Sequence, residues 1–352
     1  MSSAIAIDVE QTTEFLCKLL KTPSPTGNTA QAVSLAQTYF QSARPDASFQ
    51  HTIKGGLLAT LPGLAGDAPR TITAHVDTLG AMVKEIKENG RLKLSAIGGY
   101  LPASVVGEYC AVETGQGRRV LGTVLLSKQS VHVHPAKDIH ELGSDLNNLE
   151  VRLDERTKSQ AETEALGIQV GDFVAWDPRL EVTDSGFVKS RHLDDKASVA
   201  AIFAAVEAMR RAGISPAQTT HIFISNYEEV GHGGATGIPP DSRDLVVVDM
   251  GAIGEGQAGD EFSVSICVKD ATGPYDLGLR RHLVALAEAA GIPYNLDIYV
   301  NYGSDGSAAL RAGLDARVAL LGPGVDSSHA YERTHLDSIE NTARLLVEYL
   351  RT

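Results

Sequence analysis

The sequence of 352 residues contains only three cysteines, which are far apart in the chain, namely Cys17, Cys110 and Cys267. None of them belongs to a CxxC pair, so nothing indicates a thiolate metal site, and an odd number does not indicate a disulfide framework. The first residues also lack the basic segment and the long apolar segment of a signal peptide. We therefore expect a cytoplasmic protein.

Basic residues are scarce, with 31 Lys and Arg against 44 Asp and Glu. Without a basic surface we expect neither a nucleic-acid partner nor an anionic membrane partner. No apolar run approaches the roughly 18 residues that cross a membrane. The motifs HExxH and GxSxG are absent, which excludes those classes of zinc protease and hydrolase. We expect part of the acidic excess to face inward, where a bound cation would offset its charge.

The length exceeds what one hydrophobic core usually serves, so we expect two domains. Between about residues 85 and 178, short β-like runs are separated by Gly, Asn and Asp, and only 156–166 favours a helix. Helical and strand patterns alternate on both sides of this segment. The sequence therefore predicts an α/β sandwich that is interrupted by a small β-rich insertion.

Two helices in the second half of the chain have clear sequence signals. "DDKASVAAIFAAVEAMRRAG" places its apolar residues on one helical face and ends at Gly213. The closing helix is expected at 338–351, with Asp337 as its N-cap and Glu340 three residues later.

Polar side chains that can bind a metal follow the apolar strand runs. They are His75 and Asp77, Glu228 and Glu229, Asp249, and the group Asp326, His329 and Glu332. In open α/β sheets ligands bind at the carboxyl ends of the strands, so we expect these side chains to lie close together. Asp194 and Asp195 stand where a long helix begins, near the positive end of its dipole.

This set of residues predicts a metal site. Imidazole and carboxylate together suit zinc and related divalent ions. Two histidines and several carboxylates exceed the needs of one tetrahedral ion, which indicates two ions that share a carboxylate. In the adjacent pair Glu228 and Glu229, one side chain can bind a cation while its neighbour moves a proton.

Five motifs, "HVDTLG", "HLDDK", "YEEVGHGGA", "VVVDMG" and "SSHAYER", occur in this order and resemble those of the M42 family of metallo-aminopeptidases. The resemblance covers nearly the whole chain. It implies a three-layer α/β/α zinc-peptidase catalytic domain in two parts, residues 1–85 and 179–352. It also implies that residues 86–178 form a β-rich, barrel-like dimerisation domain, and that the protein is a homo-oligomer built from dimers, as a dodecameric tetrahedral shell.

The resemblance implies two divalent metal ions per subunit, zinc first, with cobalt or manganese as alternatives. The ligands would be His75, Asp194, Glu229, Asp249 and His329. Asp194 would bridge the two ions, while Glu229 and Asp249 would each bind one of them.

Two further residues would act beside the ions. Asp77 would orient the ring of His75. Glu228 would take a proton from a water that bridges the ions and attacks the peptide carbonyl, and would pass this proton to the leaving nitrogen. The substrate would be a peptide that loses its N-terminal residue.

The sequence departs from the family pattern in three places. Thr78 stands where the family has an acidic residue, Lys196 where it has Arg, and Gly233 where it has the Arg of "EEVGxRGA". None of the three is an implied ligand. We therefore expect changes at the rim of the site and in substrate preference rather than in metal binding.

Two other functions are compatible with the motifs. An N-acyl-amino-acid deacylase or a dipeptide amidohydrolase, for example in compatible-solute metabolism, would use the same dinuclear site, and no residue separates it from an aminopeptidase. A non-catalytic metal-binding or scaffold protein is disfavoured by Glu228, since a degenerate member would lose its base before its fold.

Overall fold

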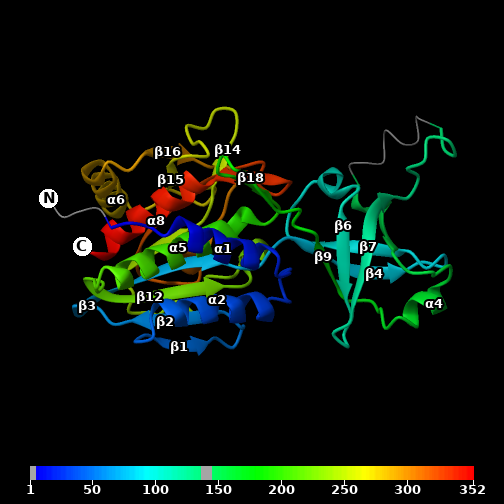
Figure 1. Ribbon diagram of the computed structural model, residues 1–352, viewed down its shortest axis with the longest axis horizontal. Helices are drawn as coiled ribbons and strands as arrows, with labels where there is room; N and C mark the ends of the chain where they lie inside the picture. Colours follow the sequence, from blue (N-terminus) through cyan, green and yellow to red (C-terminus); the bar gives the residue numbers. More distant parts are fainter. Residues whose placement is uncertain (1–4, 136–144) are drawn as a thin grey trace.

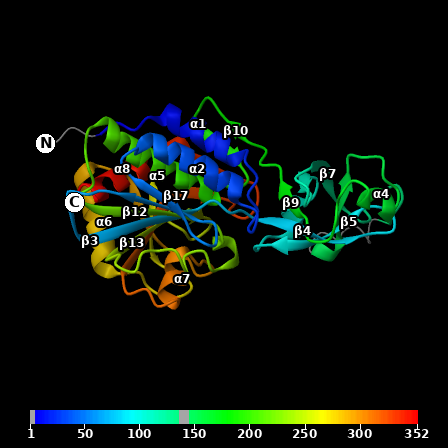
Figure 2. The same cartoon turned by 90° about the horizontal axis from the view of Figure 1, so that it is seen from below.

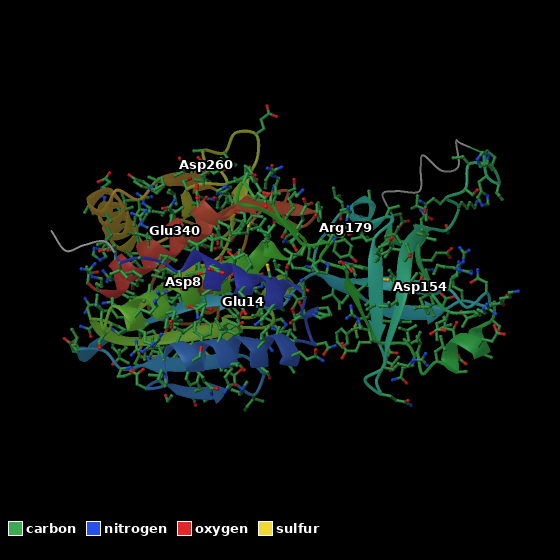
Figure 3. The ribbon with its side chains drawn as sticks, viewed as in Figure 1. Asp8, Glu14, Asp154, Arg179, Asp260 and Glu340 are labelled. Carbon is green, nitrogen blue, oxygen red and sulfur yellow. The ribbon has the colours of Figure 1, made fainter. Side chains whose placement is uncertain are left out.

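The computed structural model describes residues 5–135 and 145–352, which form two bodies (Figure 1). The larger body is a mixed sheet with helices on both faces, and the smaller one is a closed antiparallel barrel. Figure 3 labels Arg179 at the place where the two bodies meet. The predicted α/β/α catalytic domain with a barrel-like insertion is confirmed.

In the described part of the chain, the sheet of the larger body has the strand order β1-β2-β12-β3-β13-β17-β18-β11-β10, and β14, β15 and β16 join beside β17. Strands β12, β3, β13 and β17 run parallel to one another, so their carboxyl ends meet at one edge. The bounds are β1 (Ser48–His51), β2 (Leu57–Leu61), β3 (Ala65–His75), β10 (Glu181–Val182), β11 (Phe187–Ser190), β12 (Gln218–Ser225), β13 (Asp244–Val248), β14 (Gly251–Ile253), β15 (Val264–Lys269), β16 (Tyr294–Ile298), β17 (Arg317–Asp326) and β18 (Glu332–His335).

Helices cover both faces of this sheet (Figure 2). One face carries α1 (Val9–Leu20), α2 (Ala30–Ala43), α5 (Leu193–Arg211), α6 (Leu277–Ala290) and α8 (Leu336–Leu350). The other face carries α7 (Asp305–Arg311) over a smaller apolar cluster around Leu320. The larger core lies under the first face and includes the fully buried Phe15 and Phe203. Among the described residues, no helix is both long enough and apolar enough to span a bilayer.

The two helices with clear sequence signals are present, and the expected start of each is corrected. Helix α5 contains Asp194 and Asp195, but the backbone angles of both are non-helical, so regular helix begins after them. The expected N-cap Asp337 is wrong. Strand β18 runs directly into α8, and His335 is the N-cap, with its Nδ1 accepting the N–H of Asp337 at 3.0 Å.

The barrel is formed by six strands in the order β4-β5-β8-β7-β6-β9 and has an apolar core of its own. Its elements are β4 (Gly80–Ile86), β5 (Leu92–Ile97), β6 (Tyr109–Glu113), β7 (Arg119–Leu126), β8 (Leu149–Leu153), α4 (Gln160–Glu164) and β9 (Phe173–Trp176). The short α4 lies within the range 156–166 that the sequence marks as helical. Since β4 belongs to the barrel and precedes the expected boundary at residue 86, we propose Gly80–Trp176 as the inserted unit.

Candidate metal centre

The polar residues at the strand ends meet at the carboxyl edge of the parallel strands. His75 closes β3 and pairs in register with Ser225, the last residue of the neighbouring β12. Asp249 follows β13 directly, and its main-chain N–H bonds to Leu321 of β17 at 3.0 Å. A Cβ atom on Gly322 would lie 2.0 Å from the main-chain oxygen of Asp249. Only glycine at this position lets β17 approach Asp249 so closely.

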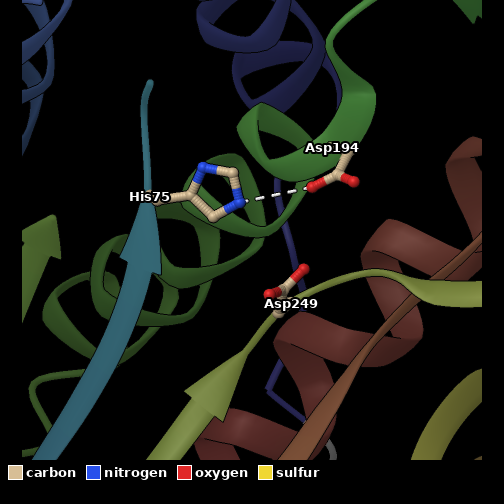
Figure 4. A group of neighbouring side chains, drawn as sticks. All are labelled: His75, Asp194 and Asp249. Atoms are coloured by element: carbon tan, nitrogen blue, oxygen red, sulfur yellow. Dashed lines mark ion pairs between the residues drawn. The ribbon is translucent and has the colours of Figure 1, made fainter. Parts of the chain in front are cut away.

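Five of the predicted residues form two groups that share one member. His75, Asp194 and Asp249 form the first group (Figure 4), and Asp194, Glu229 and His329 form the second. Within each group, one candidate ligand atom per residue lies within 4.8 Å of the others. Nε2 of His75 is 3.2 Å from Oδ1 of Asp194, and Nε2 of His329 is 3.3 Å from its Oδ2. Asp194 therefore directs one oxygen toward each histidine.

The residues fit divalent metal ions. His75 is buried, and its Nε2 has no hydrogen-bond partner among the described residues, although it points toward carboxylates. An orphaned ring nitrogen beside carboxylate oxygens is the donor arrangement that zinc and related ions prefer. Both groups offer this combination of imidazole and carboxylate.

The electrostatics of the site also favour a cation. Burial, together with the charge of Asp194, raises the pKa of Asp249 to about 7. Burial likewise raises the pKa of Glu228 and of Glu229 well above the usual value, with nearby carboxylates adding to the shift. Asp194 differs, because burial alone would raise its pKa, but the nearby side chains of His329 and His75 outweigh this effect and lower it. Bound divalent ions would offset the mutual repulsion of these buried acids.

Asp77 fixes the adjacent glutamates. Its Oδ1 accepts the N–H of Glu228 at 3.1 Å, and its Oδ2 accepts the N–H of Glu229 at 3.2 Å and the hydroxyl of Thr26 at 2.7 Å. Nδ1 of His75 lies 3.0 Å from the main-chain oxygen of Asp77 and 3.5 Å from its carboxylate. The same residue thus orients the His75 ring, mainly through its main chain, and the turn that carries both glutamates.

The side chains of the two glutamates face different parts of the site. Glu229 belongs to the second ligand group. Glu228 belongs to neither group, and its Oε2 lies 3.7 Å from Nε2 of His75. A cavity of about 240 Å³ opens in front of the site, with the lining Asp194, Glu228, Glu229, Gly231, Asp249, Met250, Asn301, Tyr302, Gly303 and His329. Glu228 therefore has a carboxylate beside His75 of the first group and within reach of a molecule in the cavity.

Two further buried carboxylates support the site. Glu332 accepts the N–H groups of Asp194 and His329, each at 3.1 Å, and burial raises its pKa to about 8. The strand-end pattern indicates Glu332 but assigns it no role. Asp305 accepts the N–H of Gly234 at 2.6 Å and the hydroxyl of Ser225. Asp305 could not be recognised from its local pattern, because "YGSDG" is typical of a helix start, and α7 does begin there.

The three departures from the family pattern lie inside the protein rather than at the rim. Thr78 and Lys196 are buried, and the ammonium of Lys196 donates to the main-chain oxygen of Thr22 at 2.8 Å. A Cβ atom on Gly233 would lie 2.4 Å from Oδ1 of Asp305. Asp305 thus occupies the space that a side chain at position 233 would need. The expectation of an altered rim is wrong for Thr78 and Lys196.

Comparisons with known proteins identify the family and the fold of this chain. The sequence model of the family described as M42 glutamyl aminopeptidase matches residues 55–345. The chain is 52% identical to the putative aminopeptidase YhfE of Bacillus subtilis, over 98% of each chain.

Two solved structures have the same fold. One is a TET aminopeptidase from a marine sediment Thaumarchaeota archaeon (TM-score 0.87, 19% identity, 97% of both chains). The other is the TET1 peptidase of Pyrococcus horikoshii, which can assemble into a tetrahedron or a large octahedral shell (TM-score 0.82, 20% identity, 96% of this chain and 99% of the other). This chain belongs to the M42 family of aminopeptidases.

Proposed function

We propose that this aminopeptidase uses two divalent metal ions and the base Glu228 to remove N-terminal residues from peptides. The observation that carries the proposal is the pair of ligand groups that share Asp194, with the carboxylate of Glu228 beside His75 and lining the same cavity. Membership of the M42 family supports peptide hydrolysis over the deacylase and amidohydrolase alternatives.

The two groups divide the metal ligands between them. His75, Asp194 and Asp249 would hold one ion, and Asp194, Glu229 and His329 would hold the other. When bound, divalent ions supply Lewis-acid polarisation of a carbonyl and a lowered pKa for nearby water. Zinc suits this set of nitrogen and oxygen donors, with cobalt and manganese as alternatives.

Glu228 is placed for proton transfer. Its main chain is fixed by Asp77, and its carboxylate lines the cavity that receives the substrate. Glu228 takes a proton from the water whose oxygen attacks the peptide carbonyl carbon. When the carbon–nitrogen bond breaks, Glu228 returns this proton to the leaving nitrogen, which departs as the new peptide amine. Burial raises the pKa of Glu228, which favours uptake of the proton, because a carboxylic acid must form and persist during the attack.

We further propose that the protein is a homo-oligomer built from dimers through the barrel, by analogy a dodecameric shell. The solved TET1 peptidase of this fold forms tetrahedral and octahedral shells. The barrel of this chain exposes large apolar side chains, including Tyr109 on β6 and Leu121 on β7. Contact with a second copy would remove this apolar surface from water.

The first prediction tests the function. Re-metallated protein should bind two divalent ions per chain and should hydrolyse aminoacyl p-nitroanilides but not N-acetyl amino acids. Metal analysis and a colorimetric assay on one preparation measure both properties. Saturation at one ion would contradict the two-metal mechanism, and cleavage of only the N-acetyl substrates would indicate the deacylase.

The second prediction separates the adjacent glutamates. Glu228→Gln should retain both ions but lower kcat by at least about 100-fold, the lower limit of what general acid–base catalysis contributes. Glu229→Gln should instead weaken metal binding, because it removes a ligand. Metal titration and steady-state kinetics of the two isosteric variants decide the matter. If Glu228→Gln weakened metal binding while Glu229→Gln retained both ions and lost kcat, the two roles would be reversed.

The third prediction concerns the N-terminal residue of the substrate. Among the described residues that line the cavity, four are carboxylates and none is Lys or Arg. An acidic substrate side chain would lose hydration there without gaining an ionic partner from the protein. We expect kcat/KM for Glu and Asp anilides to be at least about 10-fold below that for Leu and Lys anilides, a difference of roughly 1.4 kcal/mol. Asn301→Lys should narrow the gap. A preference of the unmodified protein for Glu anilide would overturn this prediction.

The fourth prediction concerns assembly. Multi-angle light scattering at micromolar concentration, with metal present, should give a mass that is an even multiple of the chain mass. A monomer under these conditions would rule out both the dimer and the shell. Tyr109→Lys combined with Leu121→Lys should reduce the mass, because both substitutions place charges on the exposed apolar surface of the barrel.

A further inference from the structure

The inserted barrel contacts the second ligand group directly. Gly98 follows β5 of the barrel and has a positive φ of 74°. A Cβ atom at this position would lie 2.4 Å from Cδ2 of Leu79 and 3.5 Å from the main-chain oxygen of Glu229. Only glycine satisfies both the backbone angle and the lack of space. The barrel loop therefore packs against the backbone of one implied metal ligand.

The next residue of this loop orients another implied ligand. Nδ1 of His329 donates a hydrogen bond to the main-chain oxygen of Gly99. A carbonyl can only accept, so in the neutral ring the proton is on Nδ1 and the lone pair is on Nε2. That Nε2 faces Asp194 at 3.3 Å and Glu229 at 3.6 Å. The barrel thus selects the tautomer of His329 that can bind a metal within the second group.

A buried arginine, Arg191, also joins the barrel to the loop that carries His329. Nε of Arg191 donates to Oε2 of Glu108 at 2.8 Å, and Nη2 donates to the main-chain oxygen of Ser104 at 2.6 Å. Nη1 donates to the main-chain oxygen of Ala330 at 3.0 Å. Glu108 and Ser104 belong to the barrel segment, whereas Ala330 is the neighbour of His329. Arg191 and Glu108 are each only 4% exposed.

Arg179 completes this junction. Its Nη1 donates to the second carboxylate oxygen of Glu108 at 2.8 Å, and its main-chain oxygen accepts the hydroxyl of Tyr331 at 2.8 Å. The residues on the carboxyl side of His329 are therefore tied to Glu108 through two arginines.

His75 and Asp249, which belong to the first ligand group alone, have no such connection. Among the described residues, their main-chain and side-chain hydrogen bonds go to residues of the larger body, such as Asp77 and Leu321. The ligands that the two groups do not share therefore differ in one respect, namely whether their geometry depends on the barrel.

We propose that the inserted barrel is part of the metal centre, with Glu108 and Arg191 as positioning residues for His329. Together with the Gly99 carbonyl, they hold the His329 ring so that the ion bound by Asp194, Glu229 and His329 is retained. This inference rests on the proposed two-metal function. It assigns the barrel a role in the chemistry of its own subunit, apart from any role in assembly.

The test is a titration of the metal-free, full-length protein with Co²⁺. Isothermal calorimetry and the visible absorption of the bound ion measure the binding at each step. Glu108→Gln should weaken one of the two sites by about 10- to 100-fold, the usual effect of losing a partner that orients a ligand. The other site should stay within about 2-fold of the unsubstituted protein. Arg191→Lys should weaken the same site, because one ammonium group cannot reach all three acceptors.

The matched control is Glu150→Gln. Glu150 is also a buried barrel glutamate with two cationic partners, but these partners, Lys87 and Arg91, lie within the barrel. Glu150→Gln should leave both sites unchanged. In a His329→Ala background, Glu108→Gln should alter Co²⁺ affinity by less than about 2-fold, because the ligand through which it acts is gone.

Three outcomes would overturn the inference. The first is that Glu108→Gln and Arg191→Lys both keep two sites of normal affinity. The second is that Glu150→Gln weakens binding as much as Glu108→Gln, which would indicate general destabilisation of the barrel. The third is that the unsubstituted protein binds fewer than two Co²⁺ ions. That third result would overturn the proposed function as well, and it differs from the first two because it needs no variant.

Discussion

The carboxylate of Asp194 lies between two histidines that come from opposite ends of the chain, with one oxygen 3.2 Å from His75 and the other 3.3 Å from His329. The rest of the site is arranged around this contact. Asp194 is nearly fully buried, and its main-chain N–H is held by Glu332. Because the two histidines lower its pKa, Asp194 stays ionised and keeps both oxygens available as acceptors or ligands.

The acidic residues at this edge of the sheet divide into two kinds. Asp77, Asp305 and Glu332 use their oxygens to accept main-chain N–H groups, and so they fix the loops that carry the site. The second kind faces the cavity and consists of Asp194, Glu228, Glu229 and Asp249. These carboxylates accept few hydrogen bonds from the protein, and the pKa of each is shifted from its usual value. The first kind makes a rigid frame, and the second kind makes a concentrated negative site that suits divalent cations. This division explains how a chain with a surplus of acids can bury so many of them together.

The arrangement also connects the candidate metal centre to the barrel. The barrel has a separate core, yet its Gly98–Gly99 loop packs against Glu229 and bonds to His329. Arg191 and Glu108 form a buried ion pair at the same junction, where loss of one partner would leave the other charge without compensation. The inserted unit is therefore joined to the larger body at the site itself rather than by a flexible linker.

The elements and the local chemistry of this protein follow from patterns within short stretches of the chain. Each local pattern is visible within about 20 residues of chain. This holds for the helical periodicity of apolar residues in α5, for the nearly continuous apolar strands β12 and β13, and for the short β-like segments of the barrel. The polar residues that follow β3, β12 and β13 are equally local, so His75, Glu228, Glu229 and Asp249 could be predicted. The N-cap of α8 could not, because the pairing of β18 with β11 and β17 decides where the preceding strand ends.

The contacts that support those residues depend on the tertiary fold. His329 and Gly99 are 230 positions apart, and Arg191 and Glu108 are 83 positions apart, so no local pattern connects them. Asp305 has the sequence of an ordinary helix start and becomes part of the site only because α7 packs beside Gly234. Periodicity and capping arise from interactions along a short stretch of backbone, whereas the hydrogen bonds of a buried loop depend on which distant segment the fold brings to it.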